Sequence, residues 1–572
     1  MKARSRLKNV ESMESLLVRM CIEAATESAD AVEKWRRQRR TLERMPSHLA
    51  DALLRSLLGR RLLFPSLLEV FKYSLEEVDL QGESCVDAEW LAYLGAFQYL
   101  RSIILADCPR INNSALWSIT DMCMTNLKEV DLSRCSKITD AGIRHLLSVP
   151  SLEKLCISET SVTAEGVMML ASLNNLFVLD LGGLPVTDSA LSSLQALKKL
   201  QHLDLWGSEV SNEGALLLKM FPSLRLLNLA WTNVTNLPNL PSLACLNMSN
   251  CTIHSLFAGG QKVSLEKVIL SGAAVTNICE AFKYVETSRL YSLDISNSSI
   301  QSFGFLCSMN AMIHLNLSDS EMTDNSVEHV AHIGANLRYL NLCNTKVSSE
   351  GIREISGYVP NLEMLLLSGT PIDDKAVPYI SMMPSLKVIN LSRTNVKGLI
   401  HREGEGDDVI DEVPSFTALG SLSHLESLDL EKLHIKDAAI PPLTKLGELR
   451  HLYLRSVSLT DVSLHHMSSS SKLMHLGVRD AVLTDGGLIS FVPPPLEVLD
   501  LRGCWLLTKD VLLHFFRKHP RIELRHELVE RVDRRNLDYL SPSRVKVNMR
   551  SSSRLKQKQG KLTDDNFLGE IY

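Results

Sequence analysis

The sequence predicts an α/β solenoid, with short parallel strands along one face and helices or turns along the other. Three observations predict this fold class. An apolar pattern of the form L-x-x-L-x-L returns along most of the chain, its period is mostly 22–25 residues, and a strand-like segment alternates with a helix-like one in each period. One such unit cannot bury its own apolar face, so successive units must stack.

Residues 1–72 lack this repeat, and their apolar spacing predicts helices that cap the array. Leu17, Cys21 and Ala25 recur every four residues, which places them on one helix face. Pro46 is expected to open a second helix, because a missing N–H costs little at a helix start. One stripe along that second helix collects Leu49, Leu53 and Leu57.

Residues 73–520 carry the repeat. The unit that starts at Leu127 illustrates why this pattern forms a strand, a turn and a helix. The apolar side chains of LKEVDL point inward from a strand, while the residues between them point outward. Cys135 fills the turn as a small, buried residue. Thr139 and Asp140 are placed to cap the helix that follows. This pattern resembles leucine-rich repeats of the cysteine-containing, ribonuclease-inhibitor-like class, which implies a horseshoe-shaped solenoid.

Eighteen units can be aligned on the apolar residue that begins each one. These head residues are Leu75, Leu100, Leu127, Leu152, Leu176, Leu200, Leu224, Leu243, Leu265, Leu290, Met312, Leu337, Leu362, Leu386, Leu425, Leu449, Leu473 and Leu496.

The array is uneven at two places. Only 19 residues separate Leu224 from Leu243, which leaves room for a turn rather than a helix. The next irregularity is an insertion near 399–414 that contains six acidic residues and one arginine. This composition predicts a mobile surface loop. Two interpretations stay open for it: a tolerated insertion, or a regulatory loop that meets a basic partner.

The repeat pattern stops after Pro520. Residues 521–540 are rich in charge and are predicted to form a strand and a helix that cover the end of the solenoid. Residues 541–572 begin with a basic, serine-rich run, which predicts a disordered tail. Such a Lys/Arg run also occurs in nuclear-localisation signals.

Composition excludes several function classes. The 572 residues carry 61 basic and 66 acidic side chains, a net charge of −5 that does not favour a nucleic-acid partner. No apolar stretch is long enough for a membrane helix, and the N-terminus has no secretory h-region. We therefore expect a cytoplasmic location. The basic tail indicates nuclear localisation as a further option.

Motifs for catalysis are also missing from the sequence. The 12 cysteines form no C-x-x-C pair, and no GxxxxGK[ST], HExxH or GxSxG motif occurs. We expect no enzyme activity, no cofactor and no metal site, so protein partners are the predicted ligands.

Candidate binding residues lie among the outward positions of the strands. Asp and Asn recur there as part of the repeat itself, so the rarer aromatic residues carry more information. Exposed aromatic side chains often dominate binding energy at protein interfaces. The predicted substrate-binding aromatics are Trp206, Trp231, Tyr339 and Tyr453.

Three arginines add a second candidate surface. Arg455, Arg479 and Arg502 fall at one equivalent position in successive repeats, so they should stand about 5 Å apart across the sheet. Two interpretations stay open for this basic ladder. Either an acidic peptide binds it, or it is neutralised from within, by residues that the sequence suggests are Asp429, Glu431 and Asp500.

The N-terminal segment resembles a known docking arrangement. Leu17-x3-Cys21-x3-Ala25 resembles the elongin-C-binding box, a short helix whose Leu enters an adaptor pocket. Pro46 and the leucine stripe after it resemble the cullin box of von Hippel–Lindau-type receptors. Zyg/Zer-type ubiquitin-ligase substrate receptors combine these elements with leucine-rich repeats in the same order. The resemblance implies a non-enzymatic subunit of a cullin-RING ubiquitin ligase, with elongin-C and a cullin as partners.

Two alternatives to this interpretation remain. The segment MPSHLADALLRSLL also resembles the opening of an F-box, which implies a Skp-type adaptor instead. The same residues could simply cap the first repeat, and the chain would then be an interaction scaffold with no ligase role.

Overall fold

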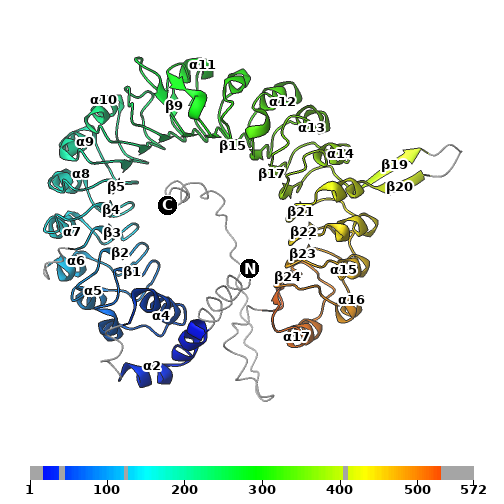
Figure 1. The fold of residues 1–572 in the computed structure, drawn as a ribbon, viewed down its shortest axis with the longest axis horizontal. Coiled ribbons are helices and arrows are strands. Elements are labelled where there is room, and N and C mark those ends of the chain that lie inside the picture. The colour runs from blue at the N-terminus through cyan, green and yellow to red at the C-terminus, as the bar shows by residue number, and fades with distance from the viewer. Residues whose placement is uncertain (1–16, 38–44, 121–125, 404–409, 530–572) are drawn as a thin grey trace, which may run out of the picture.

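The computed structural model describes residues 17–37, 45–120, 126–403 and 410–529. They curve into a nearly closed ring, with strands on the inner face and helices and turns on the outer face (Figure 1). The main sheet contains 19 strands. The predicted α/β solenoid is confirmed, including its arrangement of strands and helices.

Every strand of the main sheet runs parallel to its neighbours and pairs with the strand of the next repeat. All eighteen predicted head residues are buried, so the register read from the sequence is correct. The strands are β1 (Glu77–Asp79), β2 (Ser102–Ile104), β3 (Glu129–Asp131), β4 (Lys154–Cys156), β5 (Val178–Asp180), β6 (His202–Asp204), β7 (Leu226–Asn228), β8 (Cys245–Asn247), β11 (Lys267–Ile269), β14 (Ser292–Asp294), β15 (His314–Asn316), β16 (Tyr339–Asn341), β17 (Met364–Leu366), β18 (Val388–Asn390), β21 (Ser427–Glu431), β22 (His451–Arg455), β23 (His475–Arg479), β24 (Val498–Asp500) and β25 (Glu523–Arg525).

Helices cap the N-terminal end and cover most of the outer face, because a parallel sheet needs a crossover after each strand. The α-helices are α2 (Ala29–Arg36), α4 (Ser47–Gly59), α5 (Ala88–Leu94), α6 (Asn113–Thr120), α7 (Asp140–Leu146), α8 (Ala164–Met169), α9 (Asp188–Ser193), α10 (Asn212–Leu216), α11 (Ile278–Ala281), α12 (Asp324–Ala331), α13 (Ser349–Ser356), α14 (Ala376–Ile380), α15 (Asp461–Met467), α16 (Asp485–Ser490) and α17 (Lys509–Lys518). The 3₁₀ helices are η1 (Pro65–Phe71), η2 (Leu170–Ser172), η3 (Leu194–Ala196), η4 (Leu217–Met220), η5 (Thr287–Arg289), η6 (Gly304–Ser308), η7 (Gly334–Asn336), η8 (Ser415–Ser421), η9 (Asp437–Ala439) and η10 (Pro441–Lys445).

The outer face changes character between β7 and β15. No helix lies between β7 and β8, as the short 19-residue gap between head residues predicted. The next crossovers are built from short strand pairs, 3₁₀ turns and α11, which is four residues long. We call this stretch the helix-poor arc, residues 229–313. Its two parallel strand pairs are β9 (Thr252–Ile253) with β12 (Ala274–Val275), and β10 (Val263–Ser264) with β13 (Val285–Glu286).

The acidic insertion corrects one expectation. Its flanks form an antiparallel hairpin of β19 (Leu399–Glu403) and β20 (Ile410–Pro414), where the sequence predicted a loop throughout. Both segments contain β-branched or other apolar residues that favour strands, and pairing satisfies backbone groups that a loop leaves to water. Figure 1 shows the hairpin projecting from the outer face. Residues 404–409 lie outside the described part of the chain.

A repeated hydrogen bond joins neighbouring repeats on the outer face. Thr139 is the N-cap residue of α7, as predicted, and Asp140 follows it in the first turn. The Asp140 carboxylate accepts bonds from the backbone N–H and the hydroxyl of Thr163, at 2.8 and 2.7 Å, which ties one helix start to the next. The same bond pair joins Asp188 to Ser211, Asp324 to Ser348, Asp437 to Thr460, Asp461 to Thr484 and Asp485 to Thr508.

Cysteines in the turns after four strands form a second link between repeats. The Cys135 thiol donates a hydrogen bond of 3.1 Å to the carbonyl of Leu105 in the preceding repeat. Burial raises the pKa of this thiol to about 11, so it stays protonated and works as a donor. The equivalent bonds, each 3.1 Å, run from Cys108 to Leu80, from Cys251 to Leu229 and from Cys504 to Val478.

The C-terminal end contains the strand that the sequence predicted. Residues 523–525 form β25, which pairs with β24 and closes the sheet. The described residues end at 529. The helix expected within 521–540 and the tail 541–572 therefore stay predictions. No helix of the described stretches is long and apolar enough to cross a membrane.

Candidate functional site

Residues 17–25 form a helix that exposes a row of apolar side chains beside the ion pair of Arg19 and Glu23. The side chains of Leu17 and Met20 are 66% and 59% exposed, and Cys21 and Ala24 are exposed as well. These four positions follow helical spacing and lie on one face. We call them the apolar stripe. Leu17 and Cys21 share a helix face, as their spacing predicted, and the structure shows that this face is exposed. The sequence analysis missed Met20, which the i+3 spacing could have revealed.

The opposite side of this helix is fixed to the cap. Ala25 is half-buried against the core, so it does not share the exposure of the apolar stripe. Its carbonyl accepts a 2.8 Å hydrogen bond from the Trp35 indole N–H. Thr26 is buried and shares a 2.8 Å hydroxyl bond with Ser56, while its carbonyl accepts a bond from Arg60. The helix is therefore held at its C-terminal end and presents the apolar stripe to solvent.

The second predicted stripe is largely part of the core. Leu53 and Leu57 on α4 are 5% and 0% exposed and belong to the same apolar cluster as Leu75 of the first repeat. Neither side chain can reach a partner in this arrangement, which corrects their assignment as docking residues. Leu49 is half-buried, and Pro46 is exposed at the N-cap position, one residue before α4. Amphipathic spacing shows that a helix face is apolar, but not whether a partner or the chain itself covers it.

The two tryptophans lie in turns after their strands and differ in exposure. Trp231 is 59% exposed and has a left-handed backbone, with φ of 60°, at a turn position where Gly207 stands one repeat earlier. Trp206 is half-buried, because its indole lies over the glycine at position 182. A Cβ atom added to Gly182 would stand 2.1 Å from the indole nitrogen. The expectation that both side chains point into solvent holds for Trp231 and is wrong for Trp206.

The two tyrosines lie on strands of the inner face and are half-buried. The Tyr339 ring centroid lies 5.9 Å from that of His314 on the adjacent strand. Tyr453 leans over Gly477, its partner on the next strand. Burial raises the pKa of the Tyr453 hydroxyl, and the nearby Asp429 adds to this effect.

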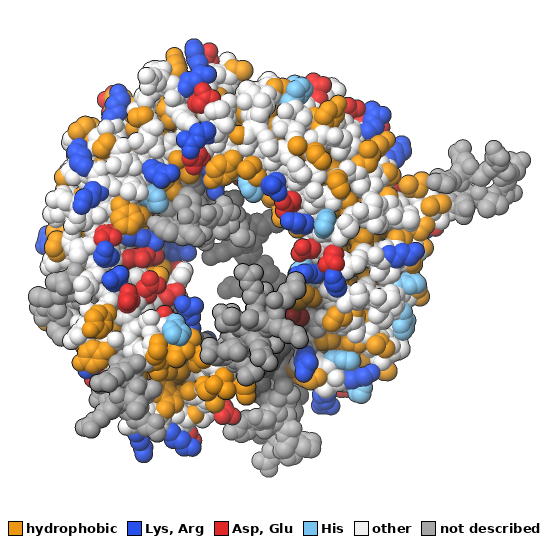
Figure 2. Space-filling model, viewed as in Figure 1, with side chains coloured by type: hydrophobic (Ala, Val, Ile, Leu, Met, Phe, Trp, Pro, Cys, Tyr) orange, Lys and Arg blue, Asp and Glu red, His pale blue; other side chains and the backbone are white. Residues whose placement is uncertain are grey.

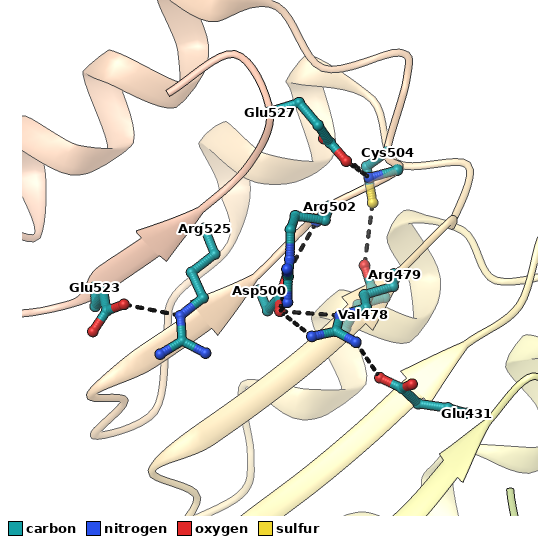
Figure 3. A network of polar contacts seen from close by, with 10 residues as sticks. Glu431, Val478, Arg479, Asp500, Arg502, Cys504, Glu523, Arg525 and Glu527 are labelled. Carbon is teal, nitrogen blue, oxygen red and sulfur yellow. Dashed lines mark hydrogen bonds and ion pairs between the residues drawn. The ribbon is translucent and has the colours of Figure 1, made fainter. Parts of the chain in front are cut away.

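The three arginines of the basic ladder lie together, as predicted, and all of them have acidic partners. Arg479 bonds to Asp500 at 2.6 Å and to Glu431 at 2.8 Å (Figure 3). Arg502 also bonds to Asp500 at 2.6 Å. Arg455 pairs with Asp480, a partner that the sequence did not suggest. Neutralisation from within is the interpretation that these ion pairs favour.

Asp500 is the central anion of this ladder. Burial would raise the pKa of its carboxyl, but hydrogen bonds from Arg502 and Arg479 outweigh burial and lower the pKa to about 2. Asp429, also proposed as a neutralising group, behaves differently. Burial raises its pKa, and its carboxylate accepts a bond from the backbone N–H of Glu431.

Charged side chains of both signs gather along the inner rim of the ring. Figure 2 shows them on the side of β1–β5 and again near β21–β24. On the first side, Lys154 pairs with Glu129 at 2.8 Å, and Lys128 pairs with Glu153 at 2.7 Å. Such paired charges form a polar surface of the kind that surrounds an interface core.

Comparison with known proteins agrees with the repeat assignment. A family profile described as "Leucine Rich repeat" matches residues 123–147. No curated protein matches the sequence significantly.

Three similar solved structures are an internalin and two proteins described as containing leucine-rich repeats. An internalin of Listeria monocytogenes (InlF) is 17% identical, with 70% of this chain and 92% of that chain covered and a TM-score of 0.37. A leucine-rich-repeat protein of Leptospira interrogans, LIC12759, is 17% identical, with coverage of 69% and 93% and a TM-score of 0.43. The ectodomain of the receptor kinase GASSHO1/SCHENGEN3 of Arabidopsis thaliana is 17% identical, with coverage of 81% and 54% and a TM-score of 0.44.

The fold assignment rests on the chain's own geometry. The head residues are buried, and parallel strands recur once per repeat around the whole ring. Solenoids of this kind offer an extended concave surface to their ligands. The chain is an α/β leucine-rich-repeat solenoid, an architecture that serves as a protein-binding scaffold.

Proposed function

We propose that this protein is the substrate-recognition subunit of a cullin-RING ubiquitin ligase. In this proposal the apolar stripe docks on an adaptor, and the inner face of the solenoid holds a protein substrate. The observation that carries the proposal is the exposure of Leu17, Met20 and Cys21 on a helix whose other side is already packed.

An exposed apolar stripe on a short helix matches a known mode of recognition. An amphipathic helix can lay its apolar face into a groove of a partner, with anchors at i, i+3, i+4 and i+7. Leu17, Met20, Cys21 and Ala24 have this spacing. Burial of one Leu side chain contributes roughly 1.5–3 kcal/mol, so two anchors can support a modest complex.

The packing of α4 favours an elongin-C adaptor over a Skp-type adaptor. An F-box interpretation would use the α4 leucines to contact the adaptor, yet Leu53 and Leu57 are buried within this chain. The elongin-C box needs only the helix at residues 17–25, which carries the exposed stripe. Pro46 and the half-buried Leu49 remain available for a cullin contact beside it.

The substrate surface proposed here centres on Trp231 and the half-buried Trp206, which lie in adjacent repeats. The half-buried Tyr339 and Tyr453 lie several repeats further along the ring, on β16 and β22. Large aromatic side chains with polar surroundings are typical anchors of protein interfaces. The ladder of Arg455, Arg479 and Arg502 contributes hydrogen-bond donors at the far end, although its charge is balanced. A substrate with mixed polar and apolar character suits this surface.

Affinity purification of the full chain tests the adaptor contact. Wild type should retain an elongin-C complex supplied in excess, and Leu17→Ser with Met20→Ser should weaken retention by about tenfold or more. The matched control is Val457→Ser with Val492→Ser, because both valines are 68% exposed and belong to repeats at the other end of the chain rather than to the N-terminal helix. The control should bind as wild type does.

The outcomes separate the ligase role from a plain scaffold. If wild type retains neither elongin-C nor a Skp-type adaptor, the ligase proposal fails and an interaction scaffold remains. Retention of a Skp-type adaptor that depends on Leu49 would instead support the F-box alternative. Thermal melting of each variant must match wild type, since a lower melting temperature would mark the stripe as part of the cap.

A further inference from the structure

A cluster of potential metal ligands lies on the outer face, away from the two surfaces described above. Cys307 belongs to η6, while His329 and His332 stand three residues apart at the C-terminal end of α12. One ligand atom from each of these residues lies within 4.8 Å of the others. All three residues are partly or fully accessible to solvent, so an ion could reach them.

The closest pair has the separation that a tetrahedral metal requires. The Cys307 Sγ and His329 Nδ1 atoms are 3.5 Å apart. With metal–ligand distances of about 2.3 Å for sulfur and about 2.0 Å for nitrogen, a tetrahedral ion places these atoms roughly 3.5 Å apart. The pair therefore needs little adjustment to share one ion.

The third ligand is held in a suitable tautomer. The Nδ1 of His332 lies 2.9 Å from the backbone carbonyl of Glu328. A carbonyl oxygen only accepts, so Nδ1 must carry the proton and Nε2 keeps the lone pair of the neutral ring. Histidine ligands of metals usually donate their other ring N–H to a carbonyl or carboxylate in this way, which fixes the ring.

We propose that Cys307, His329 and His332 form a zinc site. A thiolate with two imidazoles suits Zn²⁺, and three protein ligands leave a fourth position for water or for a partner's side chain. Binding releases the thiol proton of Cys307 to solvent, with no change of oxidation state. The bound ion would join η6 of one repeat to α12 of the next, at the border where the helix-poor arc meets regular helical repeats.

Sequence spacing hides this site. The two histidines follow an H-x2-H spacing, but the cysteine comes 22 residues before His329, about one repeat length earlier. Only the stacking of repeats brings η6 against α12. No metal site was expected because the cysteines form no C-x-x-C pair, but such a motif does not include ligands that the stacking of repeats brings together.

Cobalt substitution tests the proposal on the full chain after chelator treatment. Co²⁺ should add a near-ultraviolet thiolate-to-cobalt charge-transfer band and visible bands typical of tetrahedral cobalt, at one equivalent, and Zn²⁺ should displace them. Cys307→Ser should abolish the charge-transfer band. His329→Gln and His332→Gln should each weaken binding by about tenfold or more. Cys279→Ser and His465→Gln are matched controls, because the first removes an exposed thiol from the preceding repeat and the second a distant histidine.

A second readout guards against variants that misfold. Zn²⁺ should raise the melting temperature of chelator-treated wild type and of both controls, because an ion that binds only the folded state stabilises it. The three site variants should show a much smaller rise than wild type while still unfolding cooperatively. The proposal is overturned if wild type shows no charge-transfer band, if the band survives Cys307→Ser, or if Cys279→Ser removes it equally.

Discussion

The carboxylate of Asp461 accepts both the backbone N–H and the hydroxyl of Thr484, one repeat further along the chain, at 2.8 and 2.6 Å. The bond pair fits because Gly487 in the next helix has no side chain. A Cβ atom there would stand 2.0 Å from the Asp461 Oδ1 atom. Gly166, Gly214 and Gly351 stand in the same way against the carboxylates of Asp140, Asp188 and Asp324, whereas Ser463 and Val511 occupy this position in the two other repeats that have the bond pair.

Two adjacent glycines in α16 should respond in opposite ways to alanine. Gly487→Ala should destabilise the protein by about 1–3 kcal/mol, because the new methyl group displaces Asp461 and breaks its two bonds. Gly486→Ala should stabilise it by about 0.4–1 kcal/mol, since only the Thr484 hydroxyl, at 3.6 Å, lies near the added atom. Chemical denaturation of both variants measures the difference, and equal effects would refute this account of the stacking.

Substitutions of Trp231 and Trp206 should differ in their effect on the stability of the protein. Trp231→Gly should leave the melting temperature equal or slightly higher, because glycine adopts the left-handed turn without strain. Trp206→Ala should destabilise by about 1–3 kcal/mol through lost packing over Gly182. Thermal melting measures both effects. A strong loss of stability in Trp231→Gly would contradict the exposed placement of this side chain.

Two buried aspartates should show opposite dependence on pH. The pKa of Asp500 falls to about 2 in the folded state, so its ion pairs stabilise the protein above about pH 4, and this stability is lost as pH falls toward 2. Asp500→Asn should therefore cost about 2 kcal/mol at neutral pH, and the cost should shrink across that acidic range.

Asp180 provides the contrast. Burial raises its pKa, so its charged form opposes folding at neutral pH. Asp180→Asn should be neutral or stabilising there, because Asn occupies the same strand position at 228 and 247 and accepts the equivalent turn hydrogen bond. Denaturation as a function of pH measures both variants. An equal loss of stability at neutral pH in the two would contradict the opposite signs.

The cysteines should fall into two reactivity classes. Burial raises the pKa of Cys108 and Cys504 to about 12, so these thiols should resist alkylation in the folded protein. Cys85 and Cys279 are exposed and should react first. Peptide mass spectrometry after brief labelling at mildly alkaline pH gives the order. Early labelling of Cys504 would show that the C-terminal turns open more readily than the core does.

The sequence alone determined the repeat. The head residues, the short gap before Leu243 and the helix start at Thr139 were all predictable, because each follows from spacing along a few neighbouring residues. The Thr139 side chain makes no capping hydrogen bond, and the Asp140 carboxylate bonds to the next repeat instead. A strand turns alternate side chains to one face, and a helix repeats every 3.6 residues, so the apolar pattern shows each face directly. The repeated strands and their register therefore needed no tertiary information, whereas the β19–β20 hairpin of the acidic insertion was not predicted.

Only the tertiary structure decided what each face meets. Leu17 and Leu53 have the same helical spacing in the sequence, yet one is exposed and the other buried, because the first repeat covers α4 and leaves the helix at residues 17–25 open. Arg455 pairs with Asp480, and Cys307 approaches His329, only because repeats stack side by side. Contacts between repeats depend on how the stack curves and on how far each repeat is offset from the next. No single stretch of sequence encodes these two quantities.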